Sequence, residues 1–493
     1  MGETVVYGIT GVASTLASVF LVPFYTRILS PDAYGVSSLL GILFSVILVV
    51  ANLGMGTAIF RSYFSAKKSQ RKEVAGTAFI AQTLFPLVIA ILSWLLSGSI
   101  STLLFGTPEY SFLVVLSSIA LFFNAGLAVP LALLRAEGRP SNYVTINFAK
   151  LIATIVFSIF LVVVLRLGLA GIFWANLIGA VLGYLIGLFY SFKRISFSFS
   201  SYWLRDMLKF GLPLVPAGLA VWILNSSDRY FLNYFAGTAE VGIYNVGYRV
   251  GNLITLVTGA LQLAAPRLIF SVYEERPKDA KYYFQKINTY FYLIGFAAAF
   301  LVSVFAKEAI QILTGPAFHE AYVVIPLISF SYVAYGLFLS FGVGAAVTKK
   351  THLSALSTLM ASVLNIVLNY LLISRFGMIG AAVSTFVSFV ALALIQLVLA
   401  QRVYPVKYEF RRILIVLLVG SFLVYVATLI KFGLFLTLLL KILLVLVFPV
   451  ILYFTGFFEN REIDKLVKIW HLVLRARFKP GVILESIRQE IIT

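Results

Sequence analysis

Most of this chain consists of apolar stretches long enough to cross a lipid bilayer, separated by short polar connections. A membrane-spanning helix needs about 17 to 25 such residues, and fourteen stretches qualify. Of the 493 residues, 61% are hydrophobic and 12% are charged, whereas a soluble domain has about 25% charged residues. So much apolar surface requires lipid as its solvent. The sequence therefore predicts an all-α integral membrane protein with 14 transmembrane helices.

The expected spans form groups of six, six and two. They are Val5–Ile28, Tyr34–Phe60, Thr77–Leu104, Ser111–Leu134, Tyr143–Leu165, Ala170–Phe192; Phe210–Tyr234, Gly242–Phe270, Ile287–Phe305, Tyr322–Val347, Leu353–Ser374, Met378–Gln401; and Ile413–Ile430, Leu434–Phe457. Residues 1–205 and 206–405 are expected to be two six-helix lobes in tandem pseudo-repeat. Residues 406–458 supply two extra helices, and residues 459–493 are expected to form a cytoplasmic amphipathic tail.

Two pairs of short motifs indicate this duplication. Arg166-Leu-Gly-Leu-Ala-Gly171 returns 209 residues later as Arg375-Phe-Gly-Met-Ile-Gly380, and Gly35 of Asp32-Ala-Tyr-Gly35 is matched 207 residues later by Gly242 of Ala239-Glu-Val-Gly242. An even six-helix unit repeated in tandem keeps its orientation, so the lobes should be related by an axis along the membrane normal. This layout is typical of alternating-access transporters.

Lysine and arginine are divided unequally between the two sets of connections. Of 38 such residues, 29 fall in one set and in the tail, and 6 in the opposite set: Arg27, Arg166, Arg229, Lys307, Arg375 and Lys431. Because cytoplasmic connections carry the excess of basic residues, both termini are predicted to be cytoplasmic and the protein to lie in the cell membrane. The net charge of +19 does not indicate nucleic-acid binding, because the basic residues are interleaved with membrane spans and suit anionic lipid.

Several kinds of chemistry are missing from the sequence. There is no cysteine, and the three histidines, His319, His352 and His471, are too far apart for a metal-ligand spacing. No nucleotide-binding glycine loop is present, so no cofactor is expected. Coupling to protons, sodium ions or the membrane potential stays open.

Three groups of motifs resemble those of polysaccharide and O-antigen flippases, a family of the multidrug/oligosaccharidyl-lipid/polysaccharide exporter (MOP) superfamily. They are Leu29-Ser-Pro-Asp-Ala-Tyr-Gly35; Phe210-Gly-Leu-Pro-Leu-Val-Pro216 with Asp228-Arg229 and Val241-Gly-Ile-Tyr244; and Asn365-Ile-Val-Leu-Asn-Tyr370 with Gly377-Met-Ile-Gly-Ala-Ala382. The resemblance implies movement of an undecaprenyl-diphosphate-linked oligosaccharide from the inner to the outer leaflet. It also implies membrane lipids, and a polysaccharide polymerase or glycosyltransferases, as partners.

Charged residues inside spans are costly and mark candidate sites. Asp228 and Arg249 are each about ten residues from the turn between their helices, which puts them at one level of an antiparallel hairpin. Their charged groups are expected to lie within salt-bridge or single-water reach in at least one conformation. Either this pair is structural, or Arg249 binds the diphosphate while Asp228 serves as its counter-ion or as a coupling group.

The other candidates each have two interpretations. Lys150 either extends its ammonium to the cytoplasmic interface or captures the diphosphate at the inner mouth. Arg61 and Arg27 are phosphate contacts or interfacial anchors, at the inner and outer ends respectively. Asn365 and Asn369, spaced i, i+4, share a helix face and either join helices or contact sugar hydroxyls.

Two other functions compete with this prediction. A drug/cation antiporter of the same superfamily typically stops at twelve helices and has carboxylates in its cavity, whereas this chain has cations and one carboxylate within a span. A membrane polysaccharide polymerase or ligase needs a sizeable outer loop with catalytic groups. The longest outer connection here, around Ala306–Ala321, is short. The chain is therefore not expected to be an enzyme.

The predicted topology can be tested with single cysteines, because the native chain has none. Lys68→Cys should be shielded from a membrane-impermeant thiol reagent applied outside intact cells, and Lys431→Cys should react. Permeabilised cells, in which both positions should react, provide the control. The reverse pattern in intact cells would contradict the assigned orientation.

Overall fold

The structure is a computed structural model that describes residues 2–459 and 462–464. The chain divides into two compact units, Met1–Lys407 and Tyr408–Thr493. Across the described residues, the regular elements are all helices, and no strand occurs. The predicted amphipathic tail, residues 459–493, lies outside the described residues apart from 459 and 462–464.

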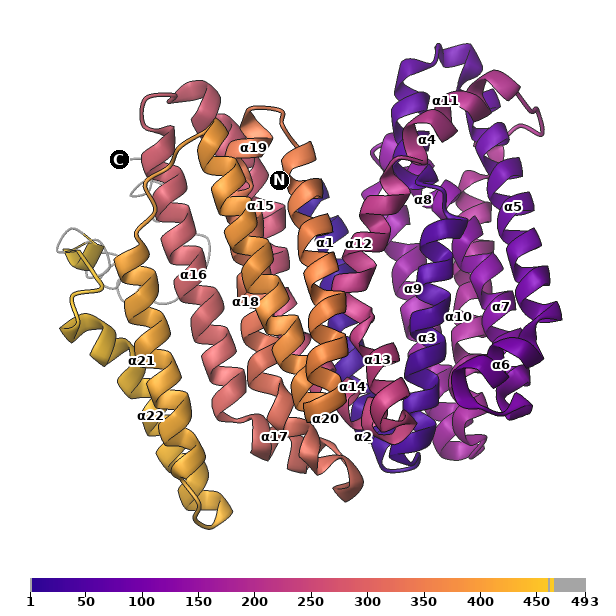
Figure 1. The fold of residues 1–493 in the computed structure, drawn as a ribbon. Coiled ribbons are helices and arrows are strands. Elements are labelled where there is room, and N and C mark those ends of the chain that lie inside the picture. The colour runs from indigo at the N-terminus through magenta and orange to yellow at the C-terminus, as the bar shows by residue number, and fades with distance from the viewer. Residues whose placement is uncertain (1, 460–461, 465–493) are drawn as a thin grey trace, which may run out of the picture. The chain divides into compact units, whose positions relative to one another are not determined.

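The first unit contains the helices α1 to α20 (Figure 1). In its N-terminal half, residues 1–205, they are α1 (Gly2–Phe20), α2 (Val22–Thr26), α3 (Pro31–Ala51), α4 (Met55–Ser65), η1 (Lys68–Gln70), α5 (Arg71–Leu95), α6 (Ser97–Phe105), η2 (Pro108–Tyr110), α7 (Ser111–Gly126), α8 (Ala128–Ala136), α9 (Pro140–Ser158), η3 (Ile159–Val164), α10 (Gly168–Ser191) and η4 (Phe192–Arg194). The linking helix α11 (Ser201–Gly211) follows.

The C-terminal half of this unit continues from α11. Its elements are α12 (Leu214–Ser226), α13 (Asp228–Ala236), α14 (Thr238–Gly251), η5 (Asn252–Ile254), α15 (Thr255–Glu275), α16 (Ala280–Val304), α17 (Ala306–Leu313), η6 (Pro316–Val324), α18 (Ile325–Phe341), α19 (Val343–Val347) and α20 (His352–Val403).

Eleven helices of the described chain are long and apolar enough to cross a membrane, or twelve if the bent pair α11 and α12 forms one span. The protein is therefore a multi-pass membrane protein, and the count of fourteen stays a prediction. The expected span Gly242–Phe270 is divided among α14, η5 and α15. Two other expected spans, Leu353–Ser374 and Met378–Gln401, lie in the single 52-residue helix α20.

Helix α20 is broken at Gly377, inside the second copy of the repeated Arg-x-Gly-x-x-Gly motif. Gly377 has φ 52° and ψ −133°, a backbone conformation that glycine adopts without a Cβ penalty. A Cβ there would overlap the carboxylate of Glu240. That carboxylate accepts a hydrogen bond from the Met378 N–H at 2.7 Å, which satisfies a donor freed by the break. The first copy likewise precedes a new helix, since Gly168, with φ 57°, begins α10.

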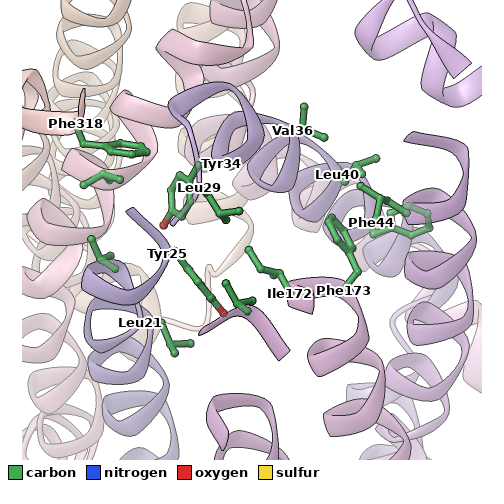
Figure 2. Close-up of a cluster of buried hydrophobic side chains, with 14 of the residues drawn as sticks. Leu21, Tyr25, Leu29, Tyr34, Val36, Leu40, Phe44, Ile172, Phe173 and Phe318 are labelled. Carbon is green, nitrogen blue, oxygen red and sulfur yellow. The ribbon is translucent and has the colours of Figure 1, made fainter. Parts of the chain in front are cut away.

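A single buried apolar cluster joins the two halves of the first unit (Figure 2). Tyr25, Tyr34 and Phe173 come from the N-terminal half, and Phe318 comes from the C-terminal half. The Tyr34 and Phe318 rings pack edge to face with centroids 5.8 Å apart, a favoured aromatic geometry. The halves therefore share a core at this level, although lipid surrounds both.

The second unit contains α21 (Phe410–Leu429) and α22 (Leu434–Phe454). Arg412, at the start of α21, is bound by Glu459 and Glu462 at 3.0 Å each and by Glu409 at 3.5 Å. These ion pairs fasten the residues that follow α22 to the first turn of α21.

Candidate functional site

Arg249 lies where the two halves of the first unit meet. It projects from α14, and its Nη1 donates to the Ser18 carbonyl of α1 at 3.3 Å. Its guanidinium carbon is 5.5 Å from the centroid of the Tyr34 ring of α3, within the range of a cation–π contact. Arg249 is only partly buried, and no described carboxylate lies within salt-bridge distance of it. The side chain thus reaches from the C-terminal half to two helices of the N-terminal half.

Asp228 does not pair with Arg249 in this structure. Its Oδ1 instead binds Nη1 of Arg229 at 2.8 Å, and the two side chains are 2% and 4% exposed. Oδ1 also accepts the Arg229 backbone N–H at 3.0 Å. Oδ2 accepts the hydroxyl protons of Tyr244 at 2.5 Å and Thr385 at 3.3 Å. In this conformation the ion pair of Asp228 is with its sequence neighbour, and the carboxylate accepts from four donors. Its proximity to Arg249 in another conformation stays a prediction.

Contrary to the sequence prediction, Arg229 does not lie in a polar connection between helices. It is in the first turn of α13, which begins at Asp228, and both residues are buried. The guanidinium carbon of Arg229 lies 3.7 Å from the Tyr248 ring centroid, and Nη1 also donates to the Asn225 carbonyl. The adjacent motif Asp228-Arg229 was the available signal, because a buried arginine needs a carboxylate and its neighbour supplies one.

The two asparagines of α20 lie beside this ion pair. Asn365 and Asn369 are 1% and 0% exposed. The Asn369 amide donates to Asn365 Oδ1 at 3.0 Å and to Ser227 Oγ at 3.1 Å, and Asn365 donates to Ser388 at 3.2 Å. Their shared face therefore binds the start of α13. Contact with sugar hydroxyls stays a prediction, and in this conformation both amides join helices.

Lys150 is held inside the N-terminal half. Its ammonium donates to the side-chain oxygen of Asn124 on α7, and its methylene chain runs past Gly183 of α10, where an added Cβ would lie 3.2 Å from the Lys150 Cβ. Within the described residues no carboxylate pairs with it. The ammonium is therefore bound to a neighbouring helix in this conformation, and both its extension to the interface and its capture of a diphosphate stay predictions.

Arg61 and Arg27 lie at opposite ends of the first unit. Arg61, in α4, pairs with Asp206 of α11 at 3.4 Å, with side chains 49% and 27% exposed, and lies 4.9 Å from the Phe210 ring centroid. Arg27 follows α2, and its Nη2 donates to the Ile312 carbonyl at 3.2 Å. Arg27 thus connects the two halves, whereas Arg61 fastens α11 to α4.

The two echoed glycines Gly35 and Gly242 touch each other. A Cβ on Gly35 would overlap the carbonyl oxygen of Thr238, and one on Gly242 would overlap that of Pro31. The Thr238 hydroxyl donates to the Asp32 carboxylate. The first turns of α3 and α14 therefore cross in backbone contact, which requires glycine on both helices. Together with the Arg27 contact, this crossing closes one end of the junction between the halves.

Known proteins resemble this chain in sequence and in fold. A family model described as polysaccharide biosynthesis protein matches residues 24–323. The "Probable low-salt glycan biosynthesis flippase Agl15" of Haloferax volcanii is 24% identical over 400 residues, which cover 80% of this chain and 81% of that protein.

Two solved structures are similar to this one over most of the chain. The lipid II flippase MurJ in an inward closed conformation gives a TM-score of 0.74 at 17% identity, over 91% of this chain and 99% of that one. An inward-facing multidrug resistance MATE transporter of the MOP superfamily gives 0.64 at 17% identity, over 82% and 94%. At these identities the likeness is one of fold.

The buried ion pair predicts an unequal response to two carboxylate substitutions. Asp228→Asn leaves Arg229 buried without a carboxylate, which costs about 3–5 kcal/mol. Asp206→Asn breaks the partly exposed pair with Arg61 and costs about 0–1 kcal/mol. The thermal midpoint of a fluorescent fusion in detergent, followed by size exclusion, should fall far more for Asp228→Asn.

A double variant provides the control for this comparison. Asp228→Asn with Arg229→Met removes both charges, so its midpoint should lie above that of Asp228→Asn alone. Equal shifts for Asp228→Asn and Asp206→Asn would mean that the Asp228–Arg229 pair is not the buried pair described.

Proposed function

Because the chain belongs to the family of polysaccharide biosynthesis proteins, we propose that it moves an undecaprenyl-diphosphate-linked oligosaccharide from the inner to the outer leaflet of the cell membrane. The family match and the folds of MurJ and MATE make it a flippase-like transporter of the MOP superfamily. The name of the Haloferax relative, a flippase of glycan biosynthesis, supports a saccharide as the transported group. A polymerase or glycosyltransferases would supply or consume that saccharide.

Arg249 is the observation that carries this proposal. Its guanidinium lies at the junction of the halves, where it contacts the neutral carbonyl of Ser18 and the ring of Tyr34. A cation within a membrane-spanning region needs a partner, and a diphosphate is a strong one, because a guanidinium binds phosphate oxygens with paired N–H donors. The diphosphate of a lipid carrier would complete the shell that Ser18 and Tyr34 begin.

An antiporter of cationic drugs fits this site less well. Such a substrate needs a carboxylate with free oxygen lone pairs, but Asp228 accepts from Arg229, Tyr244 and Thr385. The likeness of this chain to the MATE transporter is one of fold. The charge available at the junction is positive, which favours an anionic substrate.

Alternating access gives the crossing of α3 and α14 a direct role. In this conformation Gly35 and Gly242 hold the first turns of both helices together, so a large headgroup cannot pass between them. Release at this end, the outer one in the predicted topology, would require the crossing to separate. A proton gradient, a sodium gradient or the membrane potential would supply the energy for transport in this proposal. Asp228 could bind a coupling ion only after its ion pair with Arg229 separates.

Substitution of Arg249 tests the anion site. Arg249→Ala should lower flipping of lipid-linked oligosaccharide in proteoliposomes by about 10- to 100-fold, because a hydrogen bond to a charged group contributes about 1.5–3 kcal/mol. Arg249→Lys should restore only part of the activity, since the ammonium lacks the planar fork. Arg402→Ala, which removes an exposed arginine at the end of α20, serves as the matched control and should flip normally. Normal flipping by Arg249→Ala would refute the site.

A disulfide across the crossing tests alternating access. Asp32→Cys with Thr238→Cys places two thiols where side chains are hydrogen-bonded, in a chain that has no other cysteine. Oxidation should link them and stop transport, and reduction should restore it. Each single variant should be insensitive to the oxidant. Continued transport by the fully linked protein would show that the crossing need not open.

A further inference from the structure

Helix α4 carries a row of aromatic rings, Phe60, Tyr63 and Phe64. The centroids of Phe60 and Phe64 are 4.9 Å apart, and those of Tyr63 and Phe64 are 6.3 Å apart. Phe60 and Phe64 are 36% and 52% exposed. Figure 1 places α4 at the end of the bundle opposite α2 and α14, so the row lies far from the glycine crossing.

Two arginines from other helices flank this aromatic row. Arg71, the first residue of α5, has its guanidinium carbon 5.0 Å from the Tyr63 centroid and 6.0 Å from that of Phe64. Arg135, in the last turn of α8, lies 5.9 Å from the Phe60 centroid. Three helices of the N-terminal half thus bring two guanidinium groups to one set of rings.

Two carboxylates near the row are bound by other arginines. Glu137 is bound by Arg194 at 2.6 Å and by Arg139 at 3.2 Å, and it also accepts the Tyr63 hydroxyl at 3.4 Å. Asp206 is bound by Arg61 and, at 2.7 Å, by Ser62. Over the described ranges, no carboxylate lies within salt-bridge distance of Arg71 or Arg135, and the buried Nε of Arg71 has no hydrogen-bond partner. Neither guanidinium of the row therefore has a carboxylate partner among the described residues.

The cation–π contacts of Arg71 and Arg135 use none of their N–H groups as hydrogen-bond donors. A guanidinium held by its face keeps its in-plane N–H donors for an anion. Phosphate oxygens match the geometry of these donors. Two such groups on one aromatic row suit a ligand with more than one negative charge, and a diphosphate meets that requirement better than the single charge of a phospholipid such as phosphatidylglycerol.

We propose that Arg71 and Arg135, together with the aromatic row of α4, dock the diphosphate of the lipid-linked substrate before it reaches Arg249. This proposal rests on the proposed function for the identity of its ligand. In the predicted topology the row lies at the cytoplasmic end, where the substrate is loaded. The molecule would then have separate positions for capture and for translocation of the same anion.

Binding of inorganic pyrophosphate to the full chain in phosphatidylcholine nanodiscs tests the site. Arg71→Gln with Arg135→Gln should weaken binding by about tenfold or more, as expected for loss of charge-assisted hydrogen bonds. Lys67→Gln with Lys68→Gln removes the same charge from the neighbouring connection and should change binding less than twofold. Equal weakening by both double variants would reduce the site to general surface charge and overturn the proposal. Size exclusion of each variant checks that it is folded.

Competition between lipids identifies the ligand. Undecaprenyl diphosphate in the nanodisc should displace pyrophosphate from the wild-type protein, whereas added phosphatidylglycerol should not. Displacement by phosphatidylglycerol alone would make the row a headgroup site and refute its role in substrate capture.

Arg249→Ala separates this proposal from the proposed function. It should lower flipping by about 10- to 100-fold but leave pyrophosphate binding at the aromatic row intact. If Arg249→Ala loses all binding while the Arg71 and Arg135 variant binds normally, the capture site is wrong and the junction site stands. If Arg249→Ala flips normally while binding still depends on Arg71 and Arg135, the junction site fails and the capture site stands.

Discussion

A charge inside a bilayer has no water to bind, so each one must be matched within the protein or by a ligand. Asp228 and Arg229 satisfy this constraint with each other and with the tyrosines around them. Lys150 has an amide for its partner. Arg249 has a carbonyl and a ring. The three sites thus range from a charge paired with a carboxylate to one whose described contacts are neutral, and in the proposed function the mobile anion would bind at that last site, Arg249.

The junction of the halves depends on contacts that permit only one spacing. Gly35 and Gly242 bring α3 and α14 to backbone contact, and Tyr34 packs both on Phe318 and beside Arg249. Closure of the crossing and placement of the Arg249 guanidinium are therefore linked through one helix, α3. When that helix moves away from α14, the ring beside Arg249 moves with it, so an anion bound there would meet a changed shell as the end opens.

Local sequence patterns predicted where several of these residues lie along their helices. They predicted less well which neighbour each side chain contacts. The motif at Gly377 marked the break between two expected spans, and the i, i+4 spacing put Asn365 and Asn369 on one face, where they bond to each other. By contrast, the count of residues from the turn predicted how far along their helices Asp228 and Arg249 lie, but not the direction of their side chains. The echo of Gly35 and Gly242 indicated equivalence, but contact between them depends on how the halves pack, which no local pattern specifies.

Partners distinguish a structural arginine from one that handles substrate. Arg229 has a carboxylate, a carbonyl and a ring in a buried site, so a ligand would have to break an ion pair and pay its desolvation to reach it. Arg249, Arg71 and Arg135 are each held by rings without a carboxylate in the described chain. Such a guanidinium keeps a defined position while N–H donors stay available to an anion, although Arg249 uses one of them on the Ser18 carbonyl. In the two proposals, repetition of this arrangement at one end of the bundle and at the junction would let the same anionic group be held at both positions by the same chemistry. Transfer between them would then exchange one set of N–H donors for another.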